Sequence, residues 1–315
     1  CATTPKPSEE KPTPEDIASQ VQAGLLQGDQ AYRRGDTERA LLHYVTALNL
    51  EPDNTDLLYR VGMIHSETGN LDAAEQAFRS ILQTSPEHAA GLEGYGLVLL
   101  RQRKYDSAKQ VLEEAVRLER GRWRAQNGLG IISDIENDHA LAMTYYQLAL
   151  EQRPGTPMVL NNLGYSYYLA GDWDAAEEAF RRALALRPGS YEAQLSLGAA
   201  LRGLERYQAA RAAYEAARQL DDGRPEAHYN LAVLRQDYLL GQVDDVEGQL
   251  EVGSVVGVEH ELSGRHIAAA GQRISPHDRH GPAHPHRAPG RFEGLSALLL
   301  STCRQAQDTC DKQKC

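Results

Sequence analysis

The chain has 315 residues, with 44 acidic against 33 basic side chains and a formal net charge of −11. This balance argues against nucleic acid as a partner, because surfaces that bind nucleic acid are basic. The sequence also holds no apolar run of the roughly 18–20 residues that a membrane-spanning helix needs.

The chain begins with Cys1 and continues through a stretch rich in Pro, Lys, Glu and Thr as far as Pro14. This start resembles that of mature bacterial lipoproteins, whose first cysteine carries acyl chains. The resemblance implies lipidation of Cys1, which anchors a chain durably, with a flexible tether over residues 1–14. Ala2, where aspartate would signal retention at the inner membrane, implies the periplasmic face of the bacterial outer membrane. The alternative is a chain start that falls at a cysteine by chance.

Beyond the tether, small residues recur at intervals of 34 residues without an insertion or deletion. The glycine series is Gly28, Gly62, Gly96, Gly130, Gly164 and Gly198, and the alanine series is Ala40, Ala74, Ala108, Ala142, Ala176 and Ala210. A period of 34 is typical of the tetratricopeptide repeat (TPR), a helix–turn–helix unit that stacks into a solenoid. Because glycine weakens a helix interior, its recurrence indicates close packing of backbones at each helix crossing.

Other positions follow the same period. A large apolar residue is expected to fill the space beside each glycine, in the series Tyr44, Phe78, Leu112, Tyr146, Phe180 and Tyr214. Gly35, Gly69 and Gly171 are predicted to end first helices in the left-handed conformation. Asp72, Asp106 and Asp174 are predicted to cap the second helices.

These patterns predict an all-α fold, a right-handed TPR superhelix of six full repeats plus a partial seventh with an irregular C-terminal tail. The solenoid is expected over residues 15–240, with repeats that start near residues 21, 55, 89, 123, 157, 191 and 225. Such an array is stabilised by contacts between neighbouring repeats rather than by one central core.

Position in the repeat also indicates which side chains face the concave groove. The lining expected to bind a partner is apolar and rich in tyrosine, which suits an amphipathic helix or an extended segment. It comprises Tyr32, Tyr59, Met63, Leu97, Asn127, Ile131, Asn161, Tyr165, Tyr168, Leu169 and Tyr229. The alternative is that some of these residues pack against the chain's own tail or a neighbouring helix. The basic clamp with which eukaryotic co-chaperone repeats hold a carboxyl terminus is absent around Asn162.

The sequence favours a protein that is not an enzyme and carries no cofactor. It has no glycine-rich phosphate loop, no HExxH motif and no nucleophile elbow. Its acidic residues are scattered over helix faces that we expect to be solvated. Function is therefore expected in the groove.

Repeat character stops near Gly241. Val243, Val246 and Leu250 have the i, i+3, i+7 spacing of a short capping helix. In the tail over residues 241–315 we expect little order from about residue 253 to 292 and a short helix over Leu295–Ala306. In this tail His277, His280, His284 and His286 are weak candidates for a metal site, because their spacing matches no standard zinc motif. Whether Cys303, Cys310 and Cys315 pair is left open.

Two segments, Trp123–Gly130 and Val159–Asp172, resemble the TadD-type proteins of tight-adherence (Flp) pilus systems. The resemblance covers roughly residues 1–240 and implies an outer-membrane lipoprotein that binds a pilus or secretion-system component, such as a secretin. Two alternatives are a periplasmic adaptor that delivers substrates to a protease and a targeting subunit of a cell-wall enzyme complex. The sequence leaves homo-oligomerisation open.

Overall fold

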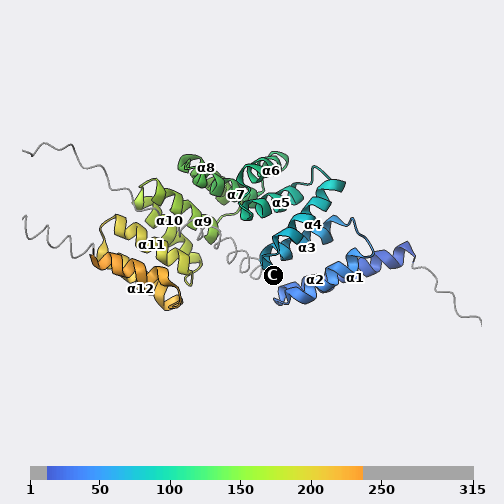
Figure 1. Ribbon diagram of the computed structural model, residues 1–315, viewed down its shortest axis with the longest axis horizontal. Helices are drawn as coiled ribbons and strands as arrows, with labels where there is room; N and C mark the ends of the chain where they lie inside the picture. Colours follow the sequence, from blue (N-terminus) through green and yellow to red (C-terminus); the bar gives the residue numbers. More distant parts are fainter. Residues whose placement is uncertain (1–12, 237–315) are drawn as a thin grey trace, which may run out of the picture.

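The computed structural model describes residues 13–236, and this part of the chain is helical with no β-strand. Its helices are joined by short turns and follow one another along an arch (Figure 1). In chain order they are α1 Pro14–Arg33, α2 Thr37–Leu48, α3 Thr55–Thr68, α4 Leu71–Thr84, α5 Ala89–Arg101, α6 Tyr105–Leu118, α7 Trp123–Ile135, α8 His139–Gln152, α9 Pro157–Leu169, α10 Trp173–Leu186, α11 Tyr191–Gly203 and α12 Tyr207–Leu220. Residues 225–236 are also helical.

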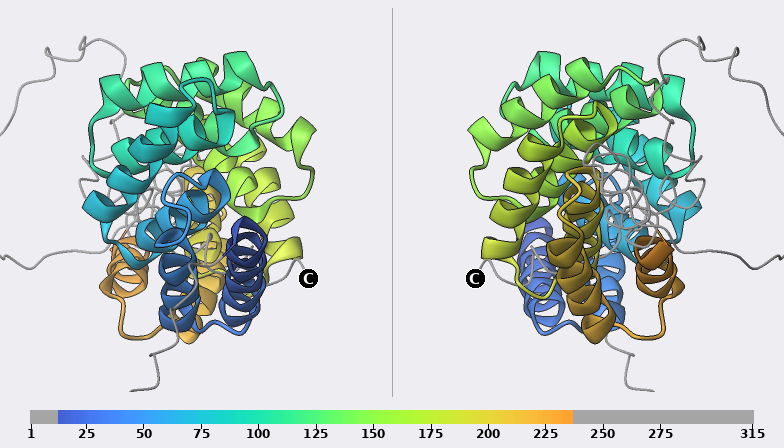
Figure 2. Two further views of the ribbon diagram at one scale, coloured as in Figure 1. Left: turned by 90° about the vertical axis from the view of Figure 1, so that its right-hand side faces the viewer. Right: turned by 90° about the vertical axis from the view of Figure 1, so that its left-hand side faces the viewer.

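Successive helices pair into hairpins, and each hairpin packs on the next. The helices of a hairpin, such as α7 and α8, contact each other more extensively than helices of neighbouring hairpins do. Viewed from either end, the hairpins wind around a common axis (Figure 2). The predicted all-α solenoid of TPR type is therefore confirmed.

The core of each hairpin is the predicted pair of a glycine and a large residue. The large residues Tyr44, Phe78, Leu112, Tyr146, Phe180 and Tyr214 are at most 1% exposed. A Cβ added to the glycine of the same repeat would lie only 2.3–2.9 Å from the nearest atom of that side chain. Glycine is required at these crossings because the partner side chain occupies the space of a Cβ.

The turn inside each hairpin uses one left-handed residue. Gly35, Gly69 and Gly171 have φ values of 78°, 83° and 82°, as predicted. The structure adds three residues at the same place in the other repeats that are not glycine. These are Arg103, Asn137 and Glu205, with φ values of 61°, 64° and 57°.

The predicted N-caps of the second helices are wrong by two residues. Asp72, Asp106 and Asp174 lie in the first turns of α4, α6 and α10, where their charge still favours the positive end of the helix. The capping residue instead follows the left-handed residue directly, because the helix starts as soon as the turn is complete. Asp36, Asp138 and Asp172 accept a backbone N–H in this way.

The described part begins with a capped helix. Thr13 and Asp16 form a reciprocal capping box at the start of α1, which begins at Pro14. The predicted tether therefore overlaps helix at Pro14, while Cys1 and the rest of the tether outside Thr13 lie beyond the described residues. The histidines and cysteines of the predicted tail also lie outside them. None of the helices within residues 13–236 is long and apolar enough to cross a membrane.

Candidate functional site: the inner face of the solenoid

The first helices of the hairpins form the inner side of the arch. Each odd-numbered helix from α3 to α11 contacts the next odd-numbered helix directly, whereas even-numbered neighbours contact each other less. The inner path of a curved stack is the shorter one, so its helices lie closer together. Figure 1 shows the same arrangement, with α5 and α7 inside α6 and α8.

The inner face of α9 carries the most compact group of predicted contact residues, which we call the α9 cluster: Asn161, Tyr165, Tyr168 and Leu169. Their i, i+4, i+7, i+8 spacing places them on one side of the helix. The rings of Tyr165 and Tyr168 stack with centroids 6.3 Å apart and an interplanar angle of 22°. Both rings also pack against the hydrophobic cluster that includes Leu201 of α11. Leu169 is 38% exposed at the end of the helix, so the cluster combines two half-buried rings with an accessible apolar edge.

The phenol of Tyr165 stays neutral at physiological pH. Burial raises the pKa of Tyr165 to about 12, with a smaller contribution from Tyr168. A neutral phenol both donates and accepts hydrogen bonds. The pair can therefore bind an apolar side chain on its rings and a peptide group through its hydroxyls.

Asn161 adds an unused hydrogen-bond acceptor to the same face. Its amide oxygen is buried and accepts no hydrogen bond within the structure. A buried acceptor without a donor costs about 1–3 kcal/mol, so native proteins usually satisfy it. Gln102, Gln126 and Asn162 each hold a buried amide oxygen of the same kind, so this feature does not set the α9 cluster apart.

The predicted contact residues of the early repeats are partly engaged within the solenoid. Tyr32 donates its hydroxyl hydrogen to Glu67, with oxygen–oxygen distances of 2.7 and 2.9 Å, and so links α1 to α3. The ring of Tyr59 packs edge-on against Phe78, with centroids 5.9 Å apart. Met63, like Leu97, is half-buried; Leu97 lies close to Gly128 of α7.

Two predicted contact residues are buried, and their assignment as exposed contacts is wrong. Asn127 is 2% exposed and accepts a hydrogen bond of 2.9 Å from the amide of Asn162. Ile131 is 1% exposed and belongs to the hydrophobic cluster around α7. Neither side chain presents a surface to a partner. Tyr229, on the helix over residues 225–236, is the opposite case because it is 61% exposed.

The structure also reveals a buried network that joins three helices. Asp134 of α7 accepts hydrogen bonds from Ser166 of α9 at 2.6 Å and from Tyr146 of α8 at 3.0 Å. Its second oxygen lies 3.0 Å from Nδ1 of His139. Burial raises the pKa of Asp134, although these hydrogen bonds oppose the rise. The sequence gives no signal for this network, since its members are spread over three helices.

The network does not form a nucleophilic site. A serine nucleophile needs a base that accepts its proton, with an acid that orients the base, but Ser166 donates to the carboxylate and not to His139. The described residues also contain no group of three or more His, Cys, Asp or Glu side chains that could hold a metal ion.

Comparisons with known proteins agree with this architecture. The tetratricopeptide repeat model matches residues 25–89, 96–157 and 161–225. No curated protein matches the chain.

Among solved structures, Pseudomonas aeruginosa PilF is 22% identical to this chain. The match covers 69% of this chain and 98% of PilF, with a TM-score of 0.59. PilW, a widely conserved type IV pilus biogenesis factor, is 20% identical. The match covers 70% of this chain and 100% of PilW, with a TM-score of 0.60. A tetratricopeptide repeat protein from Parabacteroides merdae is 17% identical, covers 72% and 87%, and has a TM-score of 0.54. At these identities the likeness shows a shared fold. The family model matches more than half of the residues of this chain, and the chain therefore belongs to the tetratricopeptide repeat family.

Proposed function

We propose that the chain is a non-catalytic scaffold whose inner face binds a segment of a pilus or secretion-system component, such as a secretin. The observation that carries the proposal is the α9 cluster, where the stacked rings of Tyr165 and Tyr168 are followed by the exposed Leu169. Tyrosine gives a large contact area at a small cost in conformational entropy.

The class of partner is suggested by the structural neighbours. PilW is described as a type IV pilus biogenesis factor, and its likeness to this chain extends over all of PilW at 20% identity. This shared fold supports our proposal of a pilus-related role for this chain. The TadD-type relationship and the part played by a secretin belong to this proposal.

Photo-crosslinking in cells tests the identity of the partner. A photoreactive residue in place of Tyr168 should label a pilus or secretion subunit, whereas the same residue in place of Tyr145 on α8 should not label it. Tyr145 is a matched control because it is also a half-buried tyrosine but lies on an outer helix. Specific recovery of a protease or of a cell-wall enzyme from the Tyr168 position would overturn the pilus assignment.

The crosslinked segment, made as a peptide, then tests the α9 cluster itself. Tyr168→Ala should weaken its binding by about tenfold or more, the effect of removing an aromatic anchor worth about 1.4 kcal/mol or more. Tyr145→Ala should leave the affinity within about twofold. Equal affinities for the two variants would show that the segment binds elsewhere.

The predicted lipid anchor at Cys1 and the location at the outer membrane form a separate part of the proposal. Cys1→Ser in the chain as it is expressed in bacteria should move the protein from the membrane fraction to the soluble fraction. If the Cys1→Ser protein stayed in the membrane fraction, the proposed lipid anchor would be refuted. The proposed binding role of the α9 cluster would not be affected.

A further inference from the structure

Trp173 is the first residue of α10, and its indole ring lies against the end of α11. The last residue of α11 is Gly203, where a Cβ would lie 2.7 Å from Cδ2 of Trp173 and 2.9 Å from its Cε2 and Cγ atoms. Cδ2 and Cε2 are the two carbons shared by the fused rings, and other ring atoms surround them in the plane of the indole. Gly203 therefore meets one face of the ring, and Trp173, which is 38% exposed, turns the other face outward.

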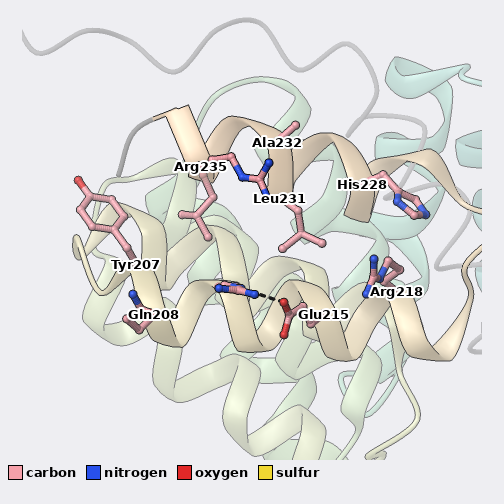
Figure 3. A pocket seen from close by; sticks show the side chains of 10 residues that line it. Tyr207, Gln208, Glu215, Arg218, His228, Leu231, Ala232 and Arg235 are labelled. Atoms are coloured by element: carbon pink, nitrogen blue, oxygen red, sulfur yellow. Dashed lines mark hydrogen bonds and ion pairs between the residues drawn. The ribbon is translucent and has the colours of Figure 1, made fainter. Parts of the chain in front are cut away.

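This pairing of an indole with a glycine is specific to one repeat. The position of Trp173 is held in the other repeats by Thr37, Leu71, Tyr105, His139 and Tyr207, and the position of Gly203 is held in the earlier repeats by Arg33, Glu67, Arg101, Ile135 and Leu169. Figure 3 shows Tyr207 at the start of α12, where it lines the same hollow as Arg235 of the helix over residues 225–236. A side chain at this position thus reaches from a second helix toward the next first helix, and a glycine there leaves room for an indole to lie flat.

The outward face of Trp173 has no partner within residues 13–236. The ring takes part in no aromatic or cation contact in that part of the chain, and the indole N–H donates no hydrogen bond there. Trp123, the other tryptophan of the sequence, differs, because the guanidinium groups of Arg124 and Arg153 lie 4.9 and 5.0 Å from its ring centroid. The negative face of an indole attracts such cations. One tryptophan therefore already carries cations, and the other offers an open face.

Carboxylates stand on both sides of Trp173 in the sequence. Asp172 is exposed, caps α10 and forms no ion pair within the described residues. The side chain of Asp174 is 77% exposed, and its ion pair in the same part of the chain is a contact of 3.6 Å with Arg206. Arg206 is held more closely by Glu177, at 2.6 Å. The negative charge beside the open face is therefore not neutralised by the helices around it.

The solenoid contains the same combination in a complete form between α11 and the helix over residues 225–236. There the guanidinium of Arg224 lies 3.8 Å from the ring centroid of Tyr191 and pairs with Glu192 at 2.6 Å and Glu226 at 3.5 Å. An aromatic face with carboxylates beside it thus holds a guanidinium in this protein. At Trp173 the face and the carboxylates are in place, and no side chain within residues 13–236 supplies the cation.

We propose that Trp173, Asp172 and Asp174 form a subsite that binds an arginine side chain of the partner segment. Arginine fits the subsite because its planar guanidinium stacks on an aromatic face and pairs with carboxylates at its edge. The source of the arginine rests on the proposed function of the α9 cluster. Leu169 of that cluster precedes Trp173 by four residues, so their Cα atoms lie at most about 14 Å apart. One extended segment of about five residues can therefore reach both.

NMR of the full chain tests this subsite with a small probe. The two indole N–H signals are assigned with Trp123→Phe and Trp173→Phe, and N-acetyl-arginine amide is added at constant ionic strength. The Trp173 signal should shift and saturate, while the Trp123 signal stays in place because Arg124 and Arg153 already cover its ring. N-acetyl-citrulline amide, which has nearly the same shape without the charge, should bind about fivefold more weakly. Equal affinities of the two probes, or no saturable shift at Trp173, would overturn the proposal.

Charge removal tests the part of the two carboxylates. Asp172→Asn with Asp174→Asn should weaken binding of the arginine probe by about threefold and leave α10 intact, because asparagine caps a helix as well as aspartate does. Glu38→Gln with Glu151→Gln removes the same net charge from exposed positions on α2 and α8 and should leave the affinity unaltered. Equal affinities of the two double variants would refute the role of the carboxylates.

Tyr168→Ala separates this subsite from the proposed function. The variant alters the α9 cluster but should leave the affinity of the arginine probe within about twofold, because the probe is too short to contact both. Loss of the crosslinked segment from Tyr168→Ala with the probe still bound would place the segment on the α9 cluster and the arginine on Trp173. A probe that binds the wild type and fails to bind Tyr168→Ala would overturn the assignment of the cation to Trp173.

Discussion

Gly130→Ala tests whether the 34-residue glycine series is required by packing. A Cβ at Gly130 would lie 2.6 Å from Cε1 of Tyr146 and 2.8 Å from its Cδ1 and Cζ atoms. Tyr146 is 0% exposed, and Asp134 holds its hydroxyl, so the ring has little freedom to move. Overpacking of this kind costs about 1–3 kcal/mol, and we expect the upper end here. The better helix propensity of alanine returns about 0.5–1 kcal/mol, which leaves a net loss of roughly 2 kcal/mol.

Urea unfolding followed by circular dichroism at 222 nm measures this loss. With an m value of about 3 kcal/mol/M, the midpoint should fall by roughly 0.7 M. Gly189→Ala is the control, since a Cβ there meets nothing within 4 Å and its free energy of unfolding should change by less than about 1 kcal/mol. A Gly130→Ala protein as stable as the wild type would refute the packing argument and would mean that the glycines are not needed at the crossings.

Three further perturbations test the turns and the contacts between repeats. Glu205→Gly should stabilise the chain by about 1 kcal/mol in urea unfolding, because Glu205 has a φ of 57° that glycine adopts without strain; no gain would contradict this. Burial raises the pKa of Asp29, but the hydrogen bonds from Arg60 and Tyr44 and the nearby arginine charges together outweigh burial, so the pKa lies below its ordinary value of 3.8. The stability that Asp29 provides relative to Asp29→Asn should therefore be equal at about pH 5 and 7 and smaller at about pH 3, where the carboxylate gains a proton; a constant difference would exclude this linkage. Arg206→Ala removes an ion pair of 2.6 Å with Glu177, but Arg206 is about half exposed, so we expect a loss of at most about 1 kcal/mol that shrinks in salt; a larger, salt-independent loss would show a packing role.

The sequence predicts best what repeats in every hairpin. Gly130 and Tyr146 could be paired from the 34-residue period because each repeat solves the same local packing problem. Glu205 shows the limit of that reasoning. Glu205 lies 34 residues after Gly171 and has the same left-handed conformation. A prediction that looks for glycine at this turn does not find it. The N-cap prediction failed for a related reason, since Asp172 begins its helix where the turn ends and Asp174 is already inside it.

Burial on the inner face could not be predicted from position in one repeat. Ile131 occupies a position that faces the groove in a generic repeat, yet it is 1% exposed here. Exposure at such a position depends on how closely successive inner helices approach, which is a property of the whole superhelix. The contact between Asp134 and Ser166 could not be predicted from the sequence either, because it joins residues of different repeats.

The buried polar contacts of the inner helices bear directly on the candidate binding site. Asn162 and Ser166 of α9 are each hydrogen-bonded to α7, through Asn127 and Asp134 respectively. Apolar stacking between repeats is not directional, whereas two hydrogen bonds one turn apart fix the rotation of α9 about its own axis as well as its distance from α7. Tyr165 lies between Asn162 and Ser166 in sequence and projects from another side of the same helix. The rotation that buries the two polar residues against α7 therefore also sets the direction in which the α9 cluster projects, so these hydrogen bonds position the candidate site.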